Sequence, residues 1–165
     1  MLDPAIQSAA SADDRVDHIF DESHLRLPRI DKDLEDLSCE AVADPLPATE
    51  RFVRYIGEQL EQSPSSLVGV LYVKEGATNG NKFVAKKLRE SMGLAPDMAM
   101  GYLDPHGKDQ RRRWNAFKET LNELDLTDQE QDECVTVAQE TFRMVMDVSR
   151  EIPEVHAAAA DSPSG

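Results

Sequence analysis

The stretch LVGVLYVKEGATNGNKFVAKKLRESMG, residues 67–93, combines the most apolar run of the chain with its most distinctive spacing of glycines. Its Asn79-Gly80 pair lies between two apolar runs, which would suit a β-hairpin with a type I′ turn. The second half of the stretch argues against a hairpin, because apolar residues recur there every four positions, which is a helical period. These residues are Val84, Leu88 and Met92. Gly93 follows them as a helix stop, so we predict a helix rather than a strand.

The first half of this stretch is also predicted to be helical, because Ser63-Pro64 precedes it and proline favours the first helical position. We therefore predict two helical halves that are joined, or kinked, between Gly76 and Gly80. Glycines four residues apart lie on one helix face and carry no Cβ, so another backbone or a flat ligand can approach the main chain there. The spacing alone leaves both explanations open, close helix packing and a ligand-binding face. A phosphate loop does not fit, because Phe83 stands where Ser or Thr would bind magnesium.

The rest of the chain shows helical periods and no convincing strand. The lead-in Met1–Ala12 is predicted to hold the end of a helix that runs through Ala5–Ala10. Further helices are predicted from a Ser11 cap to about His24, from Pro28 to about Leu37, from a Thr49 cap to about Gln62, and over Lys108–Leu124. A capping box, Thr127 to Glu130, marks the start of the last helix, which should reach about Ile152. We predict an all-α, single-domain multihelical bundle of about seven helices over residues 1–152, with a disordered tail over 153–165.

The composition narrows the function classes. A net charge of −14 argues against nucleic acid and anionic membrane surfaces as partners. No apolar run approaches the length of a membrane span, and the N-terminus lacks a signal-peptide pattern, so we expect no membrane segment and a cytoplasmic location. Cys39 and Cys134 fit that compartment and show no metal-ligand spacing.

Positive charge is concentrated in the central stretch. Five cations, Lys74, Lys82, Lys86, Lys87 and Arg89, stand there against two acids, Glu75 and Glu90. This local field suits either an ordinary solvated helix face or the carboxylates of a small ligand.

The run LYVKEGATNGNKFVAKKL, residues 71–88, resembles the distal helix of heme oxygenases, particularly bacterial members in which Tyr-x-x-Glu-Gly-Ser/Thr precedes a second glycine four residues on. Three other segments follow the family's order and approximate spacing: Arg29–Leu34, Trp114–Phe117 and Ala138–Phe142. The resemblance covers about residues 25 to 150 and implies the all-α heme oxygenase fold.

The resemblance also implies a function. Heme oxygenases hold heme between a distal and a proximal helix, and they use molecular oxygen and an external electron donor to open the ring to biliverdin, carbon monoxide and iron. On this basis the expected heme contacts are Tyr72, Lys74, Gly76, Ala77 and Gly80. Ala77 stands where many members carry an aspartate that organises distal water, and Asn81 replaces a common glycine. The family's proximal histidine lies in a helix ahead of the matching segment, so we expect a chain shortened at its N-terminus without this ligand.

Two other hypotheses remain open. A non-catalytic relative could bind another ligand or a protein through the groove that missing helices leave open, and an uncovered apolar groove would favour a homodimer. A di-iron oxidase would need carboxylates and histidines from several helices, for which Asp14, His18, Asp21 and His24 are candidates. His106 is predicted to be solvated in a turn, and Trp114 and Phe117 are predicted to lie in the core. No residue is assigned as catalytic.

Overall fold

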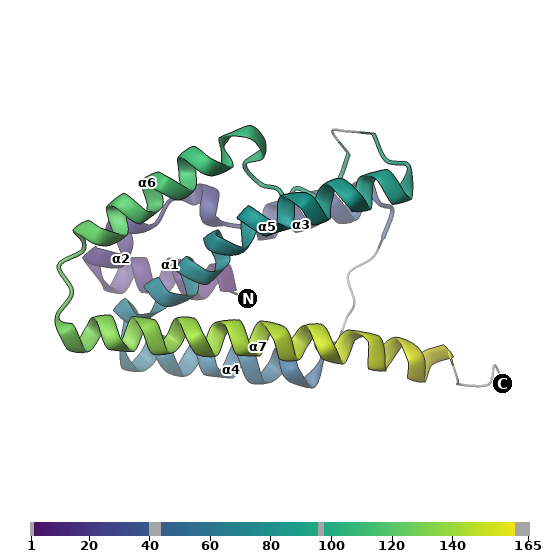
Figure 1. Ribbon diagram of the computed structural model, residues 1–165. Helices are drawn as coiled ribbons and strands as arrows, with labels where there is room; N and C mark the ends of the chain where they lie inside the picture. Colours follow the sequence, from purple (N-terminus) through teal and green to yellow (C-terminus); the bar gives the residue numbers. More distant parts are fainter. Residues whose placement is uncertain (1, 40–43, 96–97, 161–165) are drawn as a thin grey trace.

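The computed structural model describes the backbone of residues 2–39, 44–95 and 98–160, and side chains in these ranges as far as Ile152. This part of the chain forms seven α-helices and three short 3-10 helices, without a strand (Figure 1). The predicted all-α class is therefore confirmed. The α-helices are α1 (Leu2–Ala12), α2 (Asp14–Ile19), α3 (Leu27–Asp36), α4 (Pro47–Gln62), α5 (Val68–Met92), α6 (Gln110–Glu123) and α7 (Asp128–Ala160). The 3-10 helices are η1 (Glu22–His24), η2 (Pro64–Leu67) and η3 (Gly107–Asp109).

Helix α5 passes through both central glycines as one element, so the two predicted halves are joined. Polar side chains bond back onto the backbone between them: Thr78 Oγ1 donates to the Glu75 carbonyl at 2.5 Å, and Asn79 Nδ2 donates to the Gly76 carbonyl at 3.1 Å. The helix ends at Gly93, whose φ of 66° is left-handed. Glycine tolerates this conformation without a Cβ clash, as the predicted helix stop requires.

Two predicted helix starts were wrong by a few residues. Asp13, rather than Ser11, caps α2, because its Oδ1 accepts a hydrogen bond from the Arg15 backbone at 2.9 Å. Helix α4 begins at Pro47, ahead of the predicted Thr49 cap, because proline fits the first helical position without losing a hydrogen bond.

The predicted start of α7 is confirmed. Its capping box is complete: the Thr127 backbone donates to Glu130 Oε2 at 2.9 Å, and the Glu130 backbone donates to Thr127 Oγ1 at 3.3 Å. The helix continues past the predicted end at about Ile152 to Ala160. Residues 161–165 of the predicted tail lie outside the described residues.

The main core lies among α1, α2, α4, the start of α5, and α7. Its fully buried side chains include Ile6, Val16, Leu67, Val68, Leu71 and Val137. Each large apolar side chain of this kind contributes about 1.5–3 kcal/mol when it leaves water. Figure 1 shows α4 and α7 side by side along one edge, with α5 rising away toward α3 and α6. None of the helices in the described ranges is both long enough and apolar enough to cross a membrane.

The second half of α5 packs against the segment that follows it. Ala85 is fully buried against Ala99 and Met100, which both have positive φ angles of 48° and 67°. Carboxylates of α3 hold this segment: Asp33 accepts from the backbone of Gly101 at 2.7 Å, and Asp36 accepts from the backbone of Ala99 at 3.0 Å. These charge-assisted bonds stabilise a backbone conformation that L-residues otherwise avoid.

Candidate functional site

Helices α5 and α7 come into backbone contact at Gly69. A Cβ built on Gly69 would overlap the Cys134 carbonyl oxygen and would lie 2.9 Å from the Ala138 amide nitrogen. Only glycine permits such an approach. The glycine spacing left close helix packing open at Gly76 and Gly80, whereas the structure places the backbone contact at Gly69. Gly69 lies seven residues before Gly76, close to two helical turns, so helical spacing was a signal that could have placed it on the same face.

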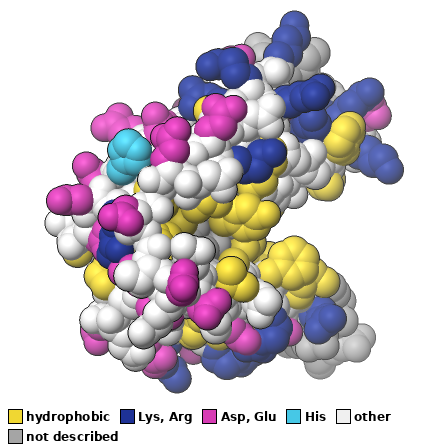
Figure 2. Space-filling view, turned by 60° about the vertical axis from the view of Figure 1, so that its left-hand side comes forward, with side chains coloured by type: hydrophobic (Ala, Val, Ile, Leu, Met, Phe, Trp, Pro, Cys, Tyr) yellow, Lys and Arg dark blue, Asp and Glu magenta, His cyan; other side chains and the backbone are white. Residues whose placement is uncertain are grey.

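C-terminal to Gly69 and Ala138, the surfaces of α5 and α7 that face each other carry exposed side chains. Helical spacing places Gly76, Gly80, Phe83 and Lys87 on the same face of α5 as Gly69. By the same rule, Phe142, Val145 and Ile152 continue the face of Ala138 on α7. Phe83 and Phe142 are each 62% exposed. Figure 2 shows a deep hollow with hydrophobic side chains on its two walls. We call it the α5–α7 groove.

The predicted glycines differ in what surrounds them. Gly80 has no atom within 4 Å of the position that a Cβ would take, and it is exposed. At Gly76 that position lies 3.4 Å from Cη2 of Trp114, which is ordinary contact with an aromatic ring. Ala77 is exposed between them. The α5 backbone is therefore open to the groove at Gly80 and closed by α6 at Gly76.

Tyr72 and Trp114 form the closed end of this surface. Their ring centroids lie 5.4 Å apart, and Trp114 stacks in turn on Phe117 at 5.7 Å. Tyr72 is 44% exposed, whereas Phe117 is buried. Tyr72, Gly76 and Gly80 thus lie along one side of α5, whereas Ala77 lies about 100° from Gly76 around the helix.

Lys74 lies apart from these four residues. Its Nζ donates to Asp3 Oδ1 at 2.7 Å, and its side chain is only 11% exposed. Burial lowers the pKa of Lys74, against the opposing effect of Asp3. Its ammonium group is engaged by α1 rather than directed into the groove.

Glu75, the residue before Gly76 on α5, belongs to a buried ionic cluster. Glu75 Oε1 accepts from Arg26 Nη2 at 2.6 Å, and Glu75 Oε2 lies 3.2 Å from His106 Nε2. The three side chains are 6%, 4% and 3% exposed for Glu75, Arg26 and His106. The prediction that His106 is solvated was therefore wrong. Because its three members come from separate segments, the cluster fixes α5 at Gly76 against the start of α3 and the turn that leads to α6.

The charge state of Glu75 follows from these partners. Burial raises the pKa of its carboxyl group, but the hydrogen bond to His106 and the charge of Arg26 outweigh burial. The net result is a pKa below the ordinary value of 4.5, so the carboxylate is ionised.

The remaining histidines with described side chains are not placed as iron ligands. His24 is buried, its Nδ1 accepts a hydrogen bond from the Asp21 backbone at 3.1 Å, and its ring packs on Phe117. His18 is exposed on α2. Within the described ranges no three His, Cys, Asp or Glu side chains gather in a metal-binding arrangement. The di-iron hypothesis therefore has no ligand set in this part of the molecule.

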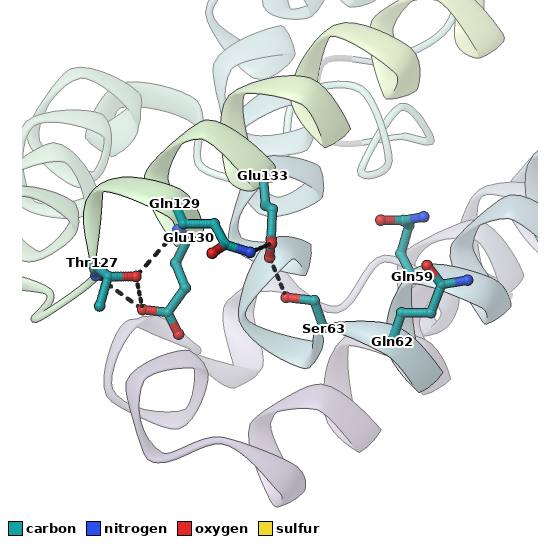
Figure 3. Close-up of a pocket in the computed structure, with 7 residues that line it drawn as sticks. All are labelled: Gln59, Gln62, Ser63, Thr127, Gln129, Glu130 and Glu133. Carbon is teal, nitrogen blue, oxygen red and sulfur yellow. Dashed lines mark hydrogen bonds between the residues drawn. The ribbon is translucent and has the colours of Figure 1, made fainter.

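A second hollow lies between the end of α4 and the start of α7 (Figure 3). It is lined by Gln59, Gln62, Ser63, Thr127, Gln129, Glu130 and Glu133. Five of these seven side chains bond to one another; for example, Ser63 Oγ donates to Glu133 Oε2 at 2.8 Å. These bonds join the two helix ends, and we assign this hollow a structural role.

Comparison with known proteins identifies a family for this chain. A family model described as heme oxygenase matches residues 2–151, from the start of α1 almost to the end of the described side chains. Searches of curated proteins and of solved structures give no match. Because the family model spans nearly the whole chain, this protein belongs to the heme oxygenase family.

Proposed function

We propose that this chain binds heme in the α5–α7 groove and opens the ring to biliverdin, carbon monoxide and iron. The observation that carries this proposal is the uncovered glycine face of α5, where no atom lies within 4 Å of the Cβ position of Gly80. A flat ring can lie against the helix backbone at this point because no side chain keeps it away.

The residues present fit the ring of heme. Phe83 and Val84 on one wall, and Phe142 and Val145 on the other, are apolar and exposed. Their burial under a ring is favourable by about 25 cal/mol for each Å² removed from water. Trp114 and Tyr72 bound one end, and cations of α5 lie near the other. Bound heme would supply the iron that takes up oxygen. The chain would supply the close backbone approach, the apolar walls that exclude water, and the ring's placement.

Proton delivery in this chain differs from the pattern of relatives with an aspartate on the distal helix. Ala77 has no proton donor, and the nearest buried acid, Glu75, is ionised and engaged by Arg26 and His106. We propose that water admitted beside the exposed Ala77 and Gly80 takes this role.

The first test is a titration of the purified chain with hemin, followed by absorbance in the Soret region. We expect saturation at one equivalent, and at least a tenfold loss of affinity for Gly80→Leu. The matched control is Gly57→Leu on α4, since Gly57 also has no atom within 4 Å of its Cβ position but lies on another helix. Absence of saturable binding by the unmodified chain would rule the proposal out.

The second test adds a reductant and oxygen to the hemin complex and follows the absorbance of biliverdin. An external electron donor is part of the proposal, and a cytoplasmic location and the homodimer remain predictions. One observation favours a second candidate, a non-catalytic binding protein: the side chains of His24 and His106 are buried in other contacts. Binding of hemin without biliverdin formation would support this candidate.

A further inference from the structure

The two walls of the α5–α7 groove are held apart by the rest of the fold. The outer half of α5 is tied to the segment that follows it, because Ala85 is fully buried against Ala99 and Met100. Helix α7 is tied to α4, where Glu151 Oε2 accepts a hydrogen bond from the Ala48 backbone at 2.7 Å. The walls therefore do not close on each other, and their apolar side chains are covered only by something other than this part of the chain.

Most of the exposed apolar side chains lie on these two walls. In the described residues twelve large hydrophobic side chains are exposed, and eight of them belong to the outer half of α5 or to α7 beyond Ala138. These eight are Phe83, Val84, Leu88, Met92, Phe142, Val145, Met146 and Ile152. Leu88 and Met92 lie about 80° and 120° around α5 from Gly80, so a flat ring on the glycine face leaves them exposed. An apolar surface of this extent is typical of a protein interaction site.

The two walls carry net charges of opposite sign. Residues 80–92 of α5 hold four cations and one acid, whereas residues 138–152 of α7 hold three acids and two cations. An α5 wall therefore repels another α5 wall and attracts an α7 wall. A second copy of the chain offers both walls at once, which makes it the occupant that these charges fit.

One twofold arrangement of two copies covers all four walls. The α5 wall of each copy lies on the α7 wall of the other, so every contact occurs twice. A stable interface takes about 20–30 residues from each copy, and residues 80–92 and 138–152 together are close to this size. Phe83 and Phe142, each 62% exposed, become aromatic anchors of the interface, where such side chains contribute most to affinity.

We propose that two copies of this chain associate through the α5–α7 groove, and that heme displaces the second copy. The association stands on the walls alone, whereas the displacement rests on the proposed function. Both occupants need Phe83 and Phe142, so the binding of one excludes the other. Linkage then requires that hemin shifts the protein toward the monomer and that association weakens hemin binding. The second copy keeps the apolar groove covered until its ligand arrives.

Sedimentation velocity of the purified chain without hemin measures the association. We expect the average mass to rise with concentration toward twice 18.4 kDa. Phe142→Lys and Phe142→Glu remove the same aromatic ring, so both should associate more weakly than the unmodified chain. They place opposite charges against the cationic α5 wall, and we expect Phe142→Lys to associate about fivefold more weakly than Phe142→Glu. The net charge of −14 would by itself favour the lysine variant, so this order identifies the α5 wall as the opposing surface.

Val135→Lys is the matched control, because Val135 is 55% exposed on α7 but precedes the groove. It should associate as the unmodified chain does. Addition of one equivalent of hemin tests the displacement: the mass should return to 18.4 kDa. The apparent affinity for hemin should also fall as the concentration of the unmodified chain rises.

The outcomes separate this inference from the proposed function. A chain that stays monomeric without hemin at every concentration overturns the inference and leaves the proposed function untouched. Equal association of Phe142→Lys and the unmodified chain would show that the copies meet at another face, which also overturns it. A dimer that binds hemin and keeps its mass contradicts the displacement. If hemin does not bind at all, the proposed function fails, and the Phe142 variants still decide the association. Circular dichroism verifies that the exposed substitutions leave the helices intact.

Discussion

The backbone of Gly69 packs directly on that of Ala138, with 2.9 Å between the Ala138 amide nitrogen and the Cβ position of the glycine. This contact is the point from which α5 and α7 diverge to form the groove (Figure 1). Gly80, eleven residues later on the same face, has no neighbour within 4 Å of its Cβ position. The same face of α5 therefore carries Gly69, where helix packing requires a glycine, and Gly80, where it does not.

We predict that Gly69→Ala lowers the free energy of unfolding by about 1–3 kcal/mol, as overpacking of a closed contact does. The new Cβ would meet backbone atoms of α7, which cannot rotate away as a flexible side chain could. Urea unfolding followed by circular dichroism measures the change. An unchanged midpoint would show that α5 can move away from α7 at little cost.

We predict that Gly80→Ala raises the free energy of unfolding by up to about 1 kcal/mol, the opposite sign to Gly69→Ala. Alanine favours the helix, and no atom lies within 4 Å of its methyl position. Gly57→Ala on α4 should gain a similar amount for the same reason. The two variants should differ in hemin titrations, where only Gly80→Ala binds more weakly. A loss of stability in Gly80→Ala would mean that this face is covered in solution.

The helical class of α5 could be predicted because a four-residue period does not depend on what covers it. The sequence could not show whether the residues of that period lie in the core or at the surface. Val84, Leu88 and Met92 predicted the helix correctly, yet all three are exposed, and the buried residue of this half is Ala85. A helical period of apolar residues indicates that one face of the helix is apolar. Such a face can line an open groove or pack in a buried core.

The ionic cluster of Glu75, Arg26 and His106 could not be predicted from the sequence, for a different reason. Glu75 meets Arg26 across 49 positions of sequence and His106 across 31. No local sequence pattern predicts a contact between residues so far apart in the chain. The run Asp104-Pro105-His106-Gly107 by itself is typical of a solvated turn. The glycine spacing, by contrast, lies within one short stretch, so the sequence alone could indicate a candidate binding face there.

Replacement of Glu75 tests the cluster. Glu75→Gln should lower the free energy of unfolding by about 3–5 kcal/mol, because it leaves Arg26 buried without the carboxylate that it pairs with. The matched control is Glu90→Gln, which removes an exposed partner of Lys86 at 3.8 Å and should change stability by less than about 0.5 kcal/mol. Denaturant unfolding midpoints of the two variants test this difference in stability. Equal midpoints would contradict a stabilising role for the buried pair.

Two buried carboxylates, Asp3 and Glu75, predict sensitivity to acid. The pKa of Asp3 is lowered, because hydrogen bonds from Lys74 and from the backbone of Leu27 and Arg26 outweigh burial, which alone would raise it. The pKa of Glu75 is lowered as well. A carboxyl group with a lowered folded-state pKa stabilises the fold fully above its ordinary pKa, and the contribution is lost as pH falls through the folded value. We expect stability to fall steeply below about pH 4, and less steeply in Glu75→Gln.

His24 predicts a separate loss of stability at mildly acidic pH. Burial is the main cause that lowers its pKa, and the nearby cations Arg26 and Lys74 add to it, against the attraction of Glu75 and Asp21. Its neutral Nδ1 accepts a hydrogen bond from the Asp21 backbone, which a protonated ring cannot do. The unfolded chain therefore binds this proton more readily, and stability should decrease as pH falls below the ordinary value of 6.5.

Thermal unfolding between pH 7.5 and pH 5.5 measures this effect. His24→Asn keeps an acceptor near Asp21 but removes the titrating ring, so its melting temperature should change less over this range than that of the unmodified chain. His18→Asn is the matched control for the loss of an imidazole, because His18 is exposed on α2. If His24→Asn and the unmodified chain show parallel pH profiles, protonation at His24 does not destabilise the fold, and the buried ring must accept its proton in place.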